Sequence, residues 1–191
     1  MLNRSMQSKA ELRAVADEMI IEGYFIVFDT NTEIYKGHYE RIDKHALDNT
    51  IGGDIRCLIN HDSNYVLGRT ISQTLSLRLD DHGLYGKVMI NPNDVDAVNA
   101  YERVKRGDVS EASFLFEILE RTIQDTSDGI LETITELKLY EISIVTFPAY
   151  ETTSVKARCD EIHQVIEDEK ARNLNAKKTT LLQKVKGKEK V

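Results

Sequence analysis

Apolar and polar positions alternate along most of the chain from residue 20 onward, and this period of two predicts a structure built mainly of β-strands. The expected strands cover residues 20–30, 55–60, 65–79, 84–90, 112–123, 130–136 and 137–147. Asp-Asp-His-Gly at 80–83 and Ser-Asp-Gly at 127–129 put glycine into short turns between such runs, which is typical of β-hairpins. We therefore expect an antiparallel sheet that curls.

The clearest helical period spans residues 91–106. Asn91 is a suitable N-cap, Pro92 suits the first helical position, and Gly107 is expected to end the helix. The apolar stripe of this helix consists of Val95, Val98, Tyr101 and Val104. The helix would deliver the chain directly into the strand that follows it.

The chain has 191 residues, of which 41% are hydrophobic, and this is enough for one core with extensions. Residues 1–19 are polar, and we expect a lead that is weakly helical or disordered. Residues 156–191 are charged and Lys-rich after a helical start, so we expect a flexible tail. The folded domain should therefore span residues 20–155.

Acidic residues outnumber basic ones, and the formal net charge is -7. This balance argues against a general nucleic-acid binder, which needs surplus Lys and Arg to neutralise phosphates. The apolar runs are strand-sized and residues 1–10 lack a signal-peptide core, so we expect neither a membrane span nor secretion. Cys57 and Cys159 form neither a disulfide framework nor a metal-ligand pair, which fits a reducing cytoplasm.

His61 and Ser113 are candidates for a general base and its nucleophile. His61 emerges directly from an apolar strand, as a rigidly placed base should, although a histidine at the edge of the core is the alternative. Ser113 lies on the strand face opposite an apolar row, which would fix its backbone while the hydroxyl stays in a cleft. That row consists of Ala112, Phe114, Phe116 and Ile118. Ser110 is a less constrained competitor.

Glu141 is the third candidate, because it puts a carboxylate into the apolar strand 137–147. Burial penalises the charged form unless a partner or hydrogen bonds stabilise it, and an imidazolium would be a suitable partner. The alternative is an inward-pointing charge on an edge strand, which protects against aggregation. Together, the three residues could form a group in which the serine attacks, the imidazole takes its proton and the acid orients the ring.

The other histidines and the acidic hairpin carry weaker hypotheses. Solvated, non-catalytic roles are expected for the histidines in turns or polar helical segments, which are His38, His45, His82 and His163. Asp80, Asp81 and His82 could be imagined as metal ligands, but adjacent residues on a short turn rarely converge on one ion. We expect no metal and no cofactor.

Three segments, in this order, resemble the motifs of the tailed-phage prohead (procapsid maturation) serine protease family. They are NHDSNYVLGR at 60–69, VKRGDVSEASFLF at 104–116 and LYEISIVTFPAY at 139–150. Further similarity is found in EGYFIVFD at 22–29, ERIDKHAL at 40–47 and DDHGLYGKVMI at 80–90. The resemblance covers residues 20–155, and the ordered combination is much more specific than any one segment.

By this resemblance, His61 corresponds to the family's catalytic histidine, Ser113 to its nucleophile and Glu141 to the third member. The family is related in fold to herpesvirus assembly proteases. This relation implies a mainly β, α+β fold in which helices flank an antiparallel, closed or nearly closed β-barrel. The family usually has glycine two residues after the serine, where this chain has Leu115, and this departure implies a narrower cleft or a changed specificity.

The resemblance implies a serine endopeptidase that acts inside the immature capsid, in the cytoplasm of the host cell. Its expected substrates are the scaffolding protein or a scaffold-like segment of the major capsid protein, and it would also cut itself. A homo-oligomer is compatible with this function, whereas nucleic acid and membrane are not expected partners. The turn at Arg106 and Gly107 is the candidate oxyanion hole. The tail would be a removable targeting segment, with a disordered extension as the alternative.

Two other functions stay open. One is a catalytically silent, protease-like module that binds scaffold or capsid protein, with its site blocked, for example, by Leu115. The other is a small β-barrel that carries a ligand. Cleavage that depends on Ser113 would separate the enzyme from the silent module, and a copurifying lipid or metabolite would favour the carrier.

Overall fold

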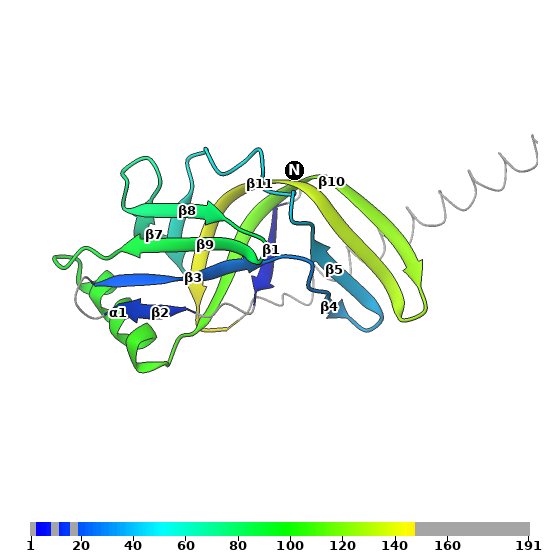
Figure 1. Ribbon diagram of the computed structural model, residues 1–191. Coiled ribbons are helices and arrows are strands. Elements are labelled where there is room, and N and C mark those ends of the chain that lie inside the picture. Colours follow the sequence, from blue (N-terminus) through cyan, green and yellow to red (C-terminus); the bar gives the residue numbers. More distant parts are fainter. Residues whose placement is uncertain (1–2, 9–11, 16–18, 148–191) are drawn as a thin grey trace, which may run out of the picture. The chain divides into compact units, whose positions relative to one another are not determined.

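The computed structural model describes residues 3–8, 12–15 and 19–147, and these form a mainly β structure with one helix (Figure 1). The strands before the helix are β1 Asn3–Ser8, β2 Arg13–Val15, β3 Ile20–Val27, β4 Thr32–Tyr35, β5 His38–Ile42, β6 Arg56–Ile59, β7 Asp62–Arg69, β8 Leu75–Leu79 and β9 Gly83–Met89. They are followed by α1 Val95–Arg106, β10 Glu111–Thr126 and β11 Gly129–Val145. The mainly β, α+β expectation is confirmed.

The strands form two sheets, one of seven strands in which β1, β10, β11, β5 and β4 lie in that order, and one of four in the order β2, β3, β9, β8. In the larger sheet β6 pairs with both β11 and β7. Within the described part of the chain neither sheet closes on itself, so the structure does not support the expected closed barrel. A closed barrel needs a partner on both edges of every strand, whereas the pairing ends at β1, β4 and β7.

Strand β11 is the centre of the larger sheet. It pairs antiparallel with β10 along one edge, while its other edge is shared by two short parallel strands. Residues 130–134 pair with β5, and residues 141–144 pair with β6. The second of these pairings brings the end of β6 beside the part of β11 that contains Glu141.

Long, curved strands β10 and β11 form a hairpin around the turn at 127–129 (Figure 1). Their register shifts near Leu115, Ile118 and Glu120, and such irregularities let a strand bend. Ala112, Phe114 and Phe116 are fully buried on one face, as the alternation predicts, and the two phenylalanine rings stack with centroids 5.0 Å apart. This face joins β3, β9 and α1 in a single hydrophobic cluster.

Helix α1 is shorter at its start than the sequence suggests. Asp94, rather than Asn91, is the N-cap, and its carboxylate accepts from the N–H groups of Asp96 and Ala97. Asn91 instead closes a turn by accepting from the N–H of Asn93. The C-terminal end is as predicted, because Gly107 caps the helix with φ of 88° in the left-handed region. The buried face consists of Ala97, Ala100, Tyr101 and Val104, whereas Val95 is exposed.

The first nineteen residues contribute strands β1 and β2 where we expected a weakly helical or disordered lead. β1 pairs with β10 along residues 112–117, and β2 pairs with β3. The hydroxyl of Tyr101 donates to the carbonyl of Val15 over 3.1 Å, which ties β2 to the helix. Pairing with longer strands compensates for the few apolar residues of this segment.

The chain divides into two compact units, residues 1–149 and 150–191. The second unit lies outside the described residues, so the expected tail, His163 and Cys159 lie there too. No helix in the described part of the chain has the length and apolar character that crossing a membrane requires.

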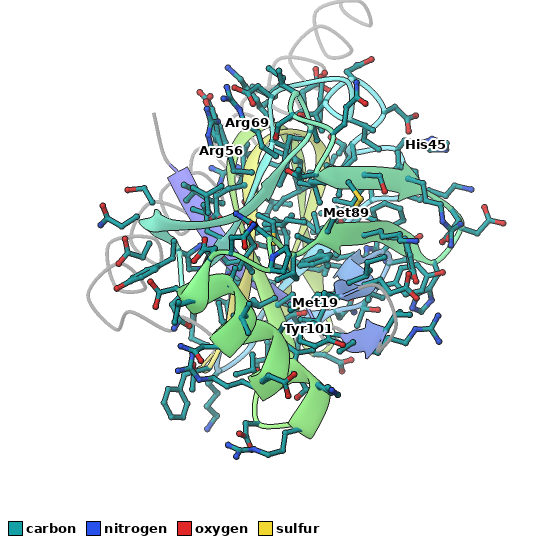
Figure 2. The ribbon with its side chains drawn as sticks, turned by 90° about the vertical axis from the view of Figure 1, so that its left-hand side faces the viewer. Met19, His45, Arg56, Arg69, Met89 and Tyr101 are labelled. Atoms are coloured by element: carbon teal, nitrogen blue, oxygen red, sulfur yellow. The ribbon has the colours of Figure 1, made fainter. Side chains whose placement is uncertain are left out.

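The carboxylate of Asp54 joins β6 and β7 at the open end of their hairpin through hydrogen bonds. Asp54 accepts two hydrogen bonds of 2.6 Å from the Arg69 guanidinium and one of 3.1 Å from Arg56. The two arginines lie side by side (Figure 2). The hydrogen bond from Arg69 is the main reason that the pKa of Asp54 is lowered from its usual value. These contacts join the start of β6 to the end of β7, where Arg56 pairs with Arg69.

Candidate active site

The turn after β6 holds His61 in an unusual backbone conformation. Asn60 and His61 both have positive φ, 49° and 60°, which costs a non-glycine residue about 1 kcal/mol or more. Two hydrogen bonds to β11 stabilise this turn: Asn60 N–H donates to the Ile144 carbonyl, and His61 N–H donates to Ser143 Oγ. A third comes from just beyond the strand, where Thr146 N–H donates to Asn60 Oδ1. The backbone of His61 is therefore fixed against the strand that contains Glu141.

The structure brings His61 and Glu141 into direct contact. Nδ1 of the imidazole forms a short hydrogen bond with Oε1 of the carboxylate, and Ser143 Oγ donates to Oε2 over 2.8 Å. Glu141 is only 4% exposed, and both of its oxygens accept a hydrogen bond, which is what a buried carboxylate requires. β11 is an interior strand here, so the alternative of a protective charge on an edge strand is wrong.

This contact defines which imidazole nitrogen can act as a base. Since Nδ1 faces the carboxylate, the neutral ring carries its proton there and leaves the lone pair on Nε2. Nε2 is buried and has no hydrogen-bond partner among residues 3–8, 12–15 and 19–147. The ring is therefore oriented with its basic nitrogen directed away from the acid, as a general base requires.

Ser113 lies one strand away from this pair. In the register of β10 and β11 it is directly opposite Ser143, and Leu115 is opposite Glu141. Side chains at opposed positions share a face, with Cβ atoms about 5 Å apart. Ser113 thus lies on the same face as Glu141 and Ser143, the two residues that hold His61. The assignment of His61, Ser113 and Glu141 as one catalytic group stays a prediction.

Ser113 is less accessible than the expected cleft implies, because only 1% of it is exposed. Leu115, two residues along the same strand face, is half-buried beside Glu141. Ser110, the competing serine, is exposed and precedes the strand. A substrate would therefore need a small displacement near Ser113 to reach the hydroxyl.

Cys57 lies close to the same carboxylate but is not a competing nucleophile. It is fully buried on β6, opposite Ile142. Burial raises the pKa of its thiol far above the usual value, and the negative charge of Glu141 raises it further. The thiol stays protonated at neutral pH, and a protonated thiol is a poor nucleophile.

The Arg106–Gly107 turn does not fit its predicted role as oxyanion hole. The N–H groups of Gly107, Asp108 and Val109 all donate to carbonyls in the last turn of α1. The guanidinium of Arg106 is mostly exposed and pairs with the Asp108 carboxylate. These donors stabilise the helix end, as expected at a C-cap, and none of them is directed at a substrate oxygen.

His38 is buried, contrary to the solvated role that we expected. It is 2% exposed, its ring stacks on Tyr35 at 4.6 Å, and Nδ1 is 2.7 Å from the Tyr35 hydroxyl. Parallel pairing of β5 with β11 puts the buried Glu132 beside Glu40 and 3.7 Å from His38 Nε2. The alternation of His38, Glu40 and Ile42 was the available indication of a shared inward face.

The remaining candidate residues, His45, His82 and Asp80, make contacts that stabilise the fold locally. His45 is exposed and contacts Asp48 at 3.0 Å, and His82 packs edge-on against Tyr24. Asp80 accepts from the N–H groups of His82 and Gly83, so its carboxylate holds the hairpin turn. Among the described residues no group of three His, Cys, Asp or Glu side chains could hold a metal ion.

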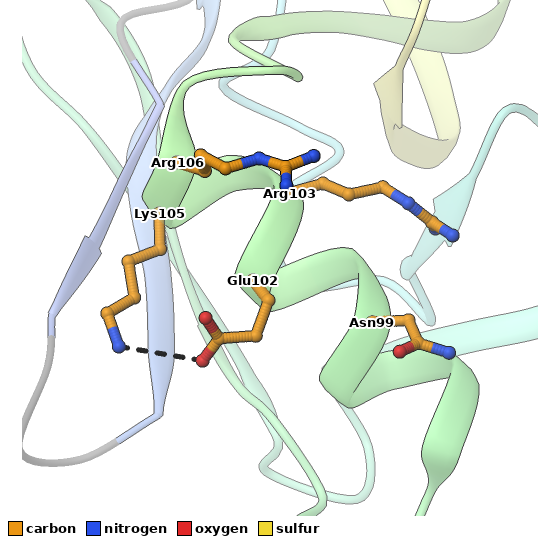
Figure 3. Close-up of a pocket in the computed structure, with 5 residues that line it drawn as sticks. All are labelled: Asn99, Glu102, Arg103, Lys105 and Arg106. Carbon is orange, nitrogen blue, oxygen red and sulfur yellow. Dashed lines mark hydrogen bonds and ion pairs between the residues drawn. The ribbon is translucent and has the colours of Figure 1, made fainter.

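Two hollows border α1, and the first of them lies between this helix and the His61 turn. The first, of about 280 Å³, is lined by Ile59, Asn60, Asp62, Tyr65, Asp96 and Arg103. The second, of about 500 Å³, follows the helix surface and is lined by Asn99, Glu102, Arg103, Lys105 and Arg106 (Figure 3). Arg103 borders both, and in Figure 3 it extends away from the Lys105–Glu102 ion pair. The first hollow is next to the histidine in sequence.

Comparison with known proteins gives one clear family match. A family model described as caudovirus prohead serine protease matches residues 6–168. No curated protein matches the chain. The solved structure of the bacteriophage T4 capsid assembly protease, gp21, is similar at 13% identity and a TM-score of 0.49, over 77% of this chain and 97% of that one.

Proposed function

Since the chain belongs to the caudovirus prohead serine protease family, we propose that it is a serine endopeptidase of prohead maturation, with Ser113, His61 and Glu141 as its catalytic group. The observation that carries this proposal is the hydrogen bond between Glu141 and His61 Nδ1. A buried acid that holds an imidazole by Nδ1 supplies two members of a serine protease triad. The position of Ser113 on β10, opposite Ser143 and on the same sheet face as Glu141, supports it as the third.

In the proposed reaction, Ser113 Oγ attacks the scissile carbonyl carbon while its proton passes to His61 Nε2. Glu141 keeps the ring in the tautomer that can accept this proton and stabilises the imidazolium that forms. The imidazolium then protonates the leaving amine, and the carbonyl carbon stays bonded to Ser113 as an ester. Water, deprotonated by the same imidazole, hydrolyses the ester and restores the serine.

The proposed substrates are scaffolding protein or a scaffold-like segment of the major capsid protein, with self-cleavage as a further reaction. The proposed place of action is the immature capsid inside the host cell. The hollow lined by Ile59, Tyr65 and Arg103 could receive a substrate side chain next to His61. We keep residues 20–155 as the proposed protease domain and 156–191 as a proposed flexible, removable tail, and a homo-oligomer as a proposed assembly.

One observation favours a second function, that of a catalytically silent assembly module that binds scaffold or capsid protein. Ser113 is almost completely buried, and Leu115 occupies the neighbouring position on its strand face. A serine that no peptide can reach would leave the fold intact but inactive. Leu115→Gly should then produce cleavage activity that the unchanged chain lacks.

Co-expression of the full chain with its neighbouring capsid gene tests the proposed function. Mass spectrometry of the capsid protein should find specific cleavage with the unchanged chain and none with Ser113→Ala. Ser110→Ala is the matched control, because it removes an exposed serine three residues away and should leave cleavage unchanged. Identical products from the unchanged chain and Ser113→Ala would refute the enzyme.

A further inference from the structure

Ser143 forms hydrogen bonds with two residues of the candidate site, and no pattern in the sequence predicts them. It is 0% exposed and lies two residues after Glu141 on β11. Its Oγ donates to Glu141 Oε2 over 2.8 Å and accepts from the His61 N–H over 3.1 Å. One hydroxyl therefore joins the acid to the backbone of the histidine, while the ring of the same histidine contacts the other oxygen of that acid.

The contacts of Ser143 exclude it as the nucleophile. Its hydroxyl proton is already donated to a carboxylate, which is a stronger acceptor than a neutral group. It also lies on the Nδ1 side of the histidine, whereas the proton of an attacking serine must go to Nε2. The hydroxyl therefore positions the other groups rather than reacting.

Two features of the site depend on the Ser143 hydroxyl. The first is the rotation of the Glu141 carboxylate, because its two oxygens are held from opposite sides by His61 and Ser143. The second is the conformation of the turn, because the His61 N–H, at a positive φ of 60°, would otherwise lose this acceptor. Losing the hydroxyl would free the carboxylate to rotate and loosen the turn at the same time.

We propose that Ser143 is a positioning residue, which fixes both the Glu141 carboxylate and the His61 turn so that Nε2 faces the nucleophile. This proposal rests on the proposed function, since it assigns a role within the same catalytic group. It predicts that the hydroxyl of Ser143 affects the rate of reaction at Ser113 and the proton on His61 Nδ1. A buried serine that only satisfied its own hydrogen bonds would affect neither.

The test uses the full chain and a fluorophosphonate probe, which needs no knowledge of the natural substrate. In labelling, Ser113 Oγ bonds to phosphorus, fluoride leaves, and the hydroxyl proton passes to His61 Nε2. We expect Ser143→Ala to lower the second-order labelling rate constant roughly 10- to 100-fold, as loss of a hydrogen bond to a charged group does. Ser143→Thr, which restores a hydroxyl, should recover most of this rate.

A second readout reports on the histidine directly. The proton on His61 Nδ1 should give the most downfield imidazole N–H resonance, assigned with His61→Gln. In Ser143→Ala this resonance should shift upfield or disappear through exchange with water. Thr133→Val, which removes a buried hydroxyl elsewhere on β11, is the matched control and should change neither the resonance nor the labelling rate.

The outcomes separate the two proposals. Labelling of Ser143→Ala at the unchanged rate, or an unchanged His61 resonance in that variant, overturns the role of Ser143. Equal labelling of the unchanged chain and Ser113→Ala, or no labelling of either, overturns the proposed function, and the resonance then still tests Ser143. Thermal unfolding accompanies each measurement. Ser143→Cys, which has the same branching as serine but a weak S–H donor in place of the hydroxyl, replaces Ser143→Ala if that variant does not fold.

Discussion

At the scale of single residues, the candidate site depends on how the hydrogen-bonding capacity of a buried carboxyl group is satisfied inside a sheet. Glu141 has its two oxygens satisfied by the His61 ring and the Ser143 hydroxyl, and β11 is flanked on both edges where it lies. Burial makes these two hydrogen bonds stronger than they would be in water, and it makes their loss more costly. The orientation of the imidazole is thus a consequence of the burial of its partner.

Glu141→Gln keeps the shape of the side chain but removes its negative charge, so it tests whether the charge is needed to hold the His61 ring in the reactive tautomer. A glutamine has one acceptor oxygen, so its amide N–H₂ would face either the His61 Nδ1–H or the Ser143 hydroxyl proton. The ring would then favour the wrong tautomer, and we expect fluorophosphonate labelling to slow by about 10³- to 10⁴-fold, as in other triads. Glu120→Gln makes the same charge change at an exposed position of β10 and should label normally. Unchanged labelling of Glu141→Gln would exclude Glu141 from the group.

The residues of this site differ in how far the sequence could predict them. Glu141 is visible in the sequence because it interrupts an apolar strand, and His61 because it directly follows one. The resemblance to a family is what links the two. Ser143 is no exception, because serine is common in strands, so its two hydrogen bonds could not be anticipated. The burial of His38 was also missed, since it depends on Glu132, more than ninety residues away in sequence.

At the scale of elements, local sequence signals predicted where α1 ends, but they did not predict which strands pair with each other. Gly107 ends α1 because only a residue without Cβ adopts φ of 88° at low cost. The predicted start of α1 at Asn91 was wrong. Asn91 and Asp94 are both good N-cap residues, but only Asp94 is followed by uninterrupted helix. The parallel pairing of β11 with β5 and β6 has no local signal, and this pairing replaces the expected barrel.

Gly107→Ala should destabilise the protein through conformation alone. A Cβ at this position meets no atom within 4 Å, so the cost comes from the left-handed backbone and should be about 1 kcal/mol. Urea unfolding, followed by circular dichroism, measures this difference. Gly52→Ala is the matched control, because a Cβ there also meets no atom within 4 Å and its φ is not positive. Equal stability of the two variants would contradict this account of the helix end.

At the scale of the whole molecule, the two sheets and the helix of the described residues share a hydrophobic cluster. The polar site lies on the other face of the β10–β11 hairpin from that cluster. Cys57 contributes to the cluster although it is two strands from Ser113. Folding therefore buries one ionisable thiol next to the carboxylate of Glu141. This burial links the stability of the fold to pH.

Unfolding should become easier in alkali because of Cys57. The pKa of its thiol is raised in the native state, first by burial and then by Glu141, whereas an unfolded cysteine loses its proton near pH 8.5. Above that pH the unfolded state binds fewer protons, so the stabilising contribution, complete at lower pH, is lost progressively at about 1.4 kcal/mol per pH unit. Urea unfolding between pH 7 and 10 should show a shallower decline for Cys57→Ala. Equal slopes would contradict a protonated native thiol.

The central claim is that Ser113, His61 and Glu141 react as one group, and the site of covalent labelling tests it most directly. After treatment of the full chain with a fluorophosphonate, peptide mass spectrometry should find the adduct on Ser113, with no adduct there in His61→Gln. An adduct on Ser113 that forms equally fast without the imidazole, or a chain with no adduct at Ser113, would contradict the account.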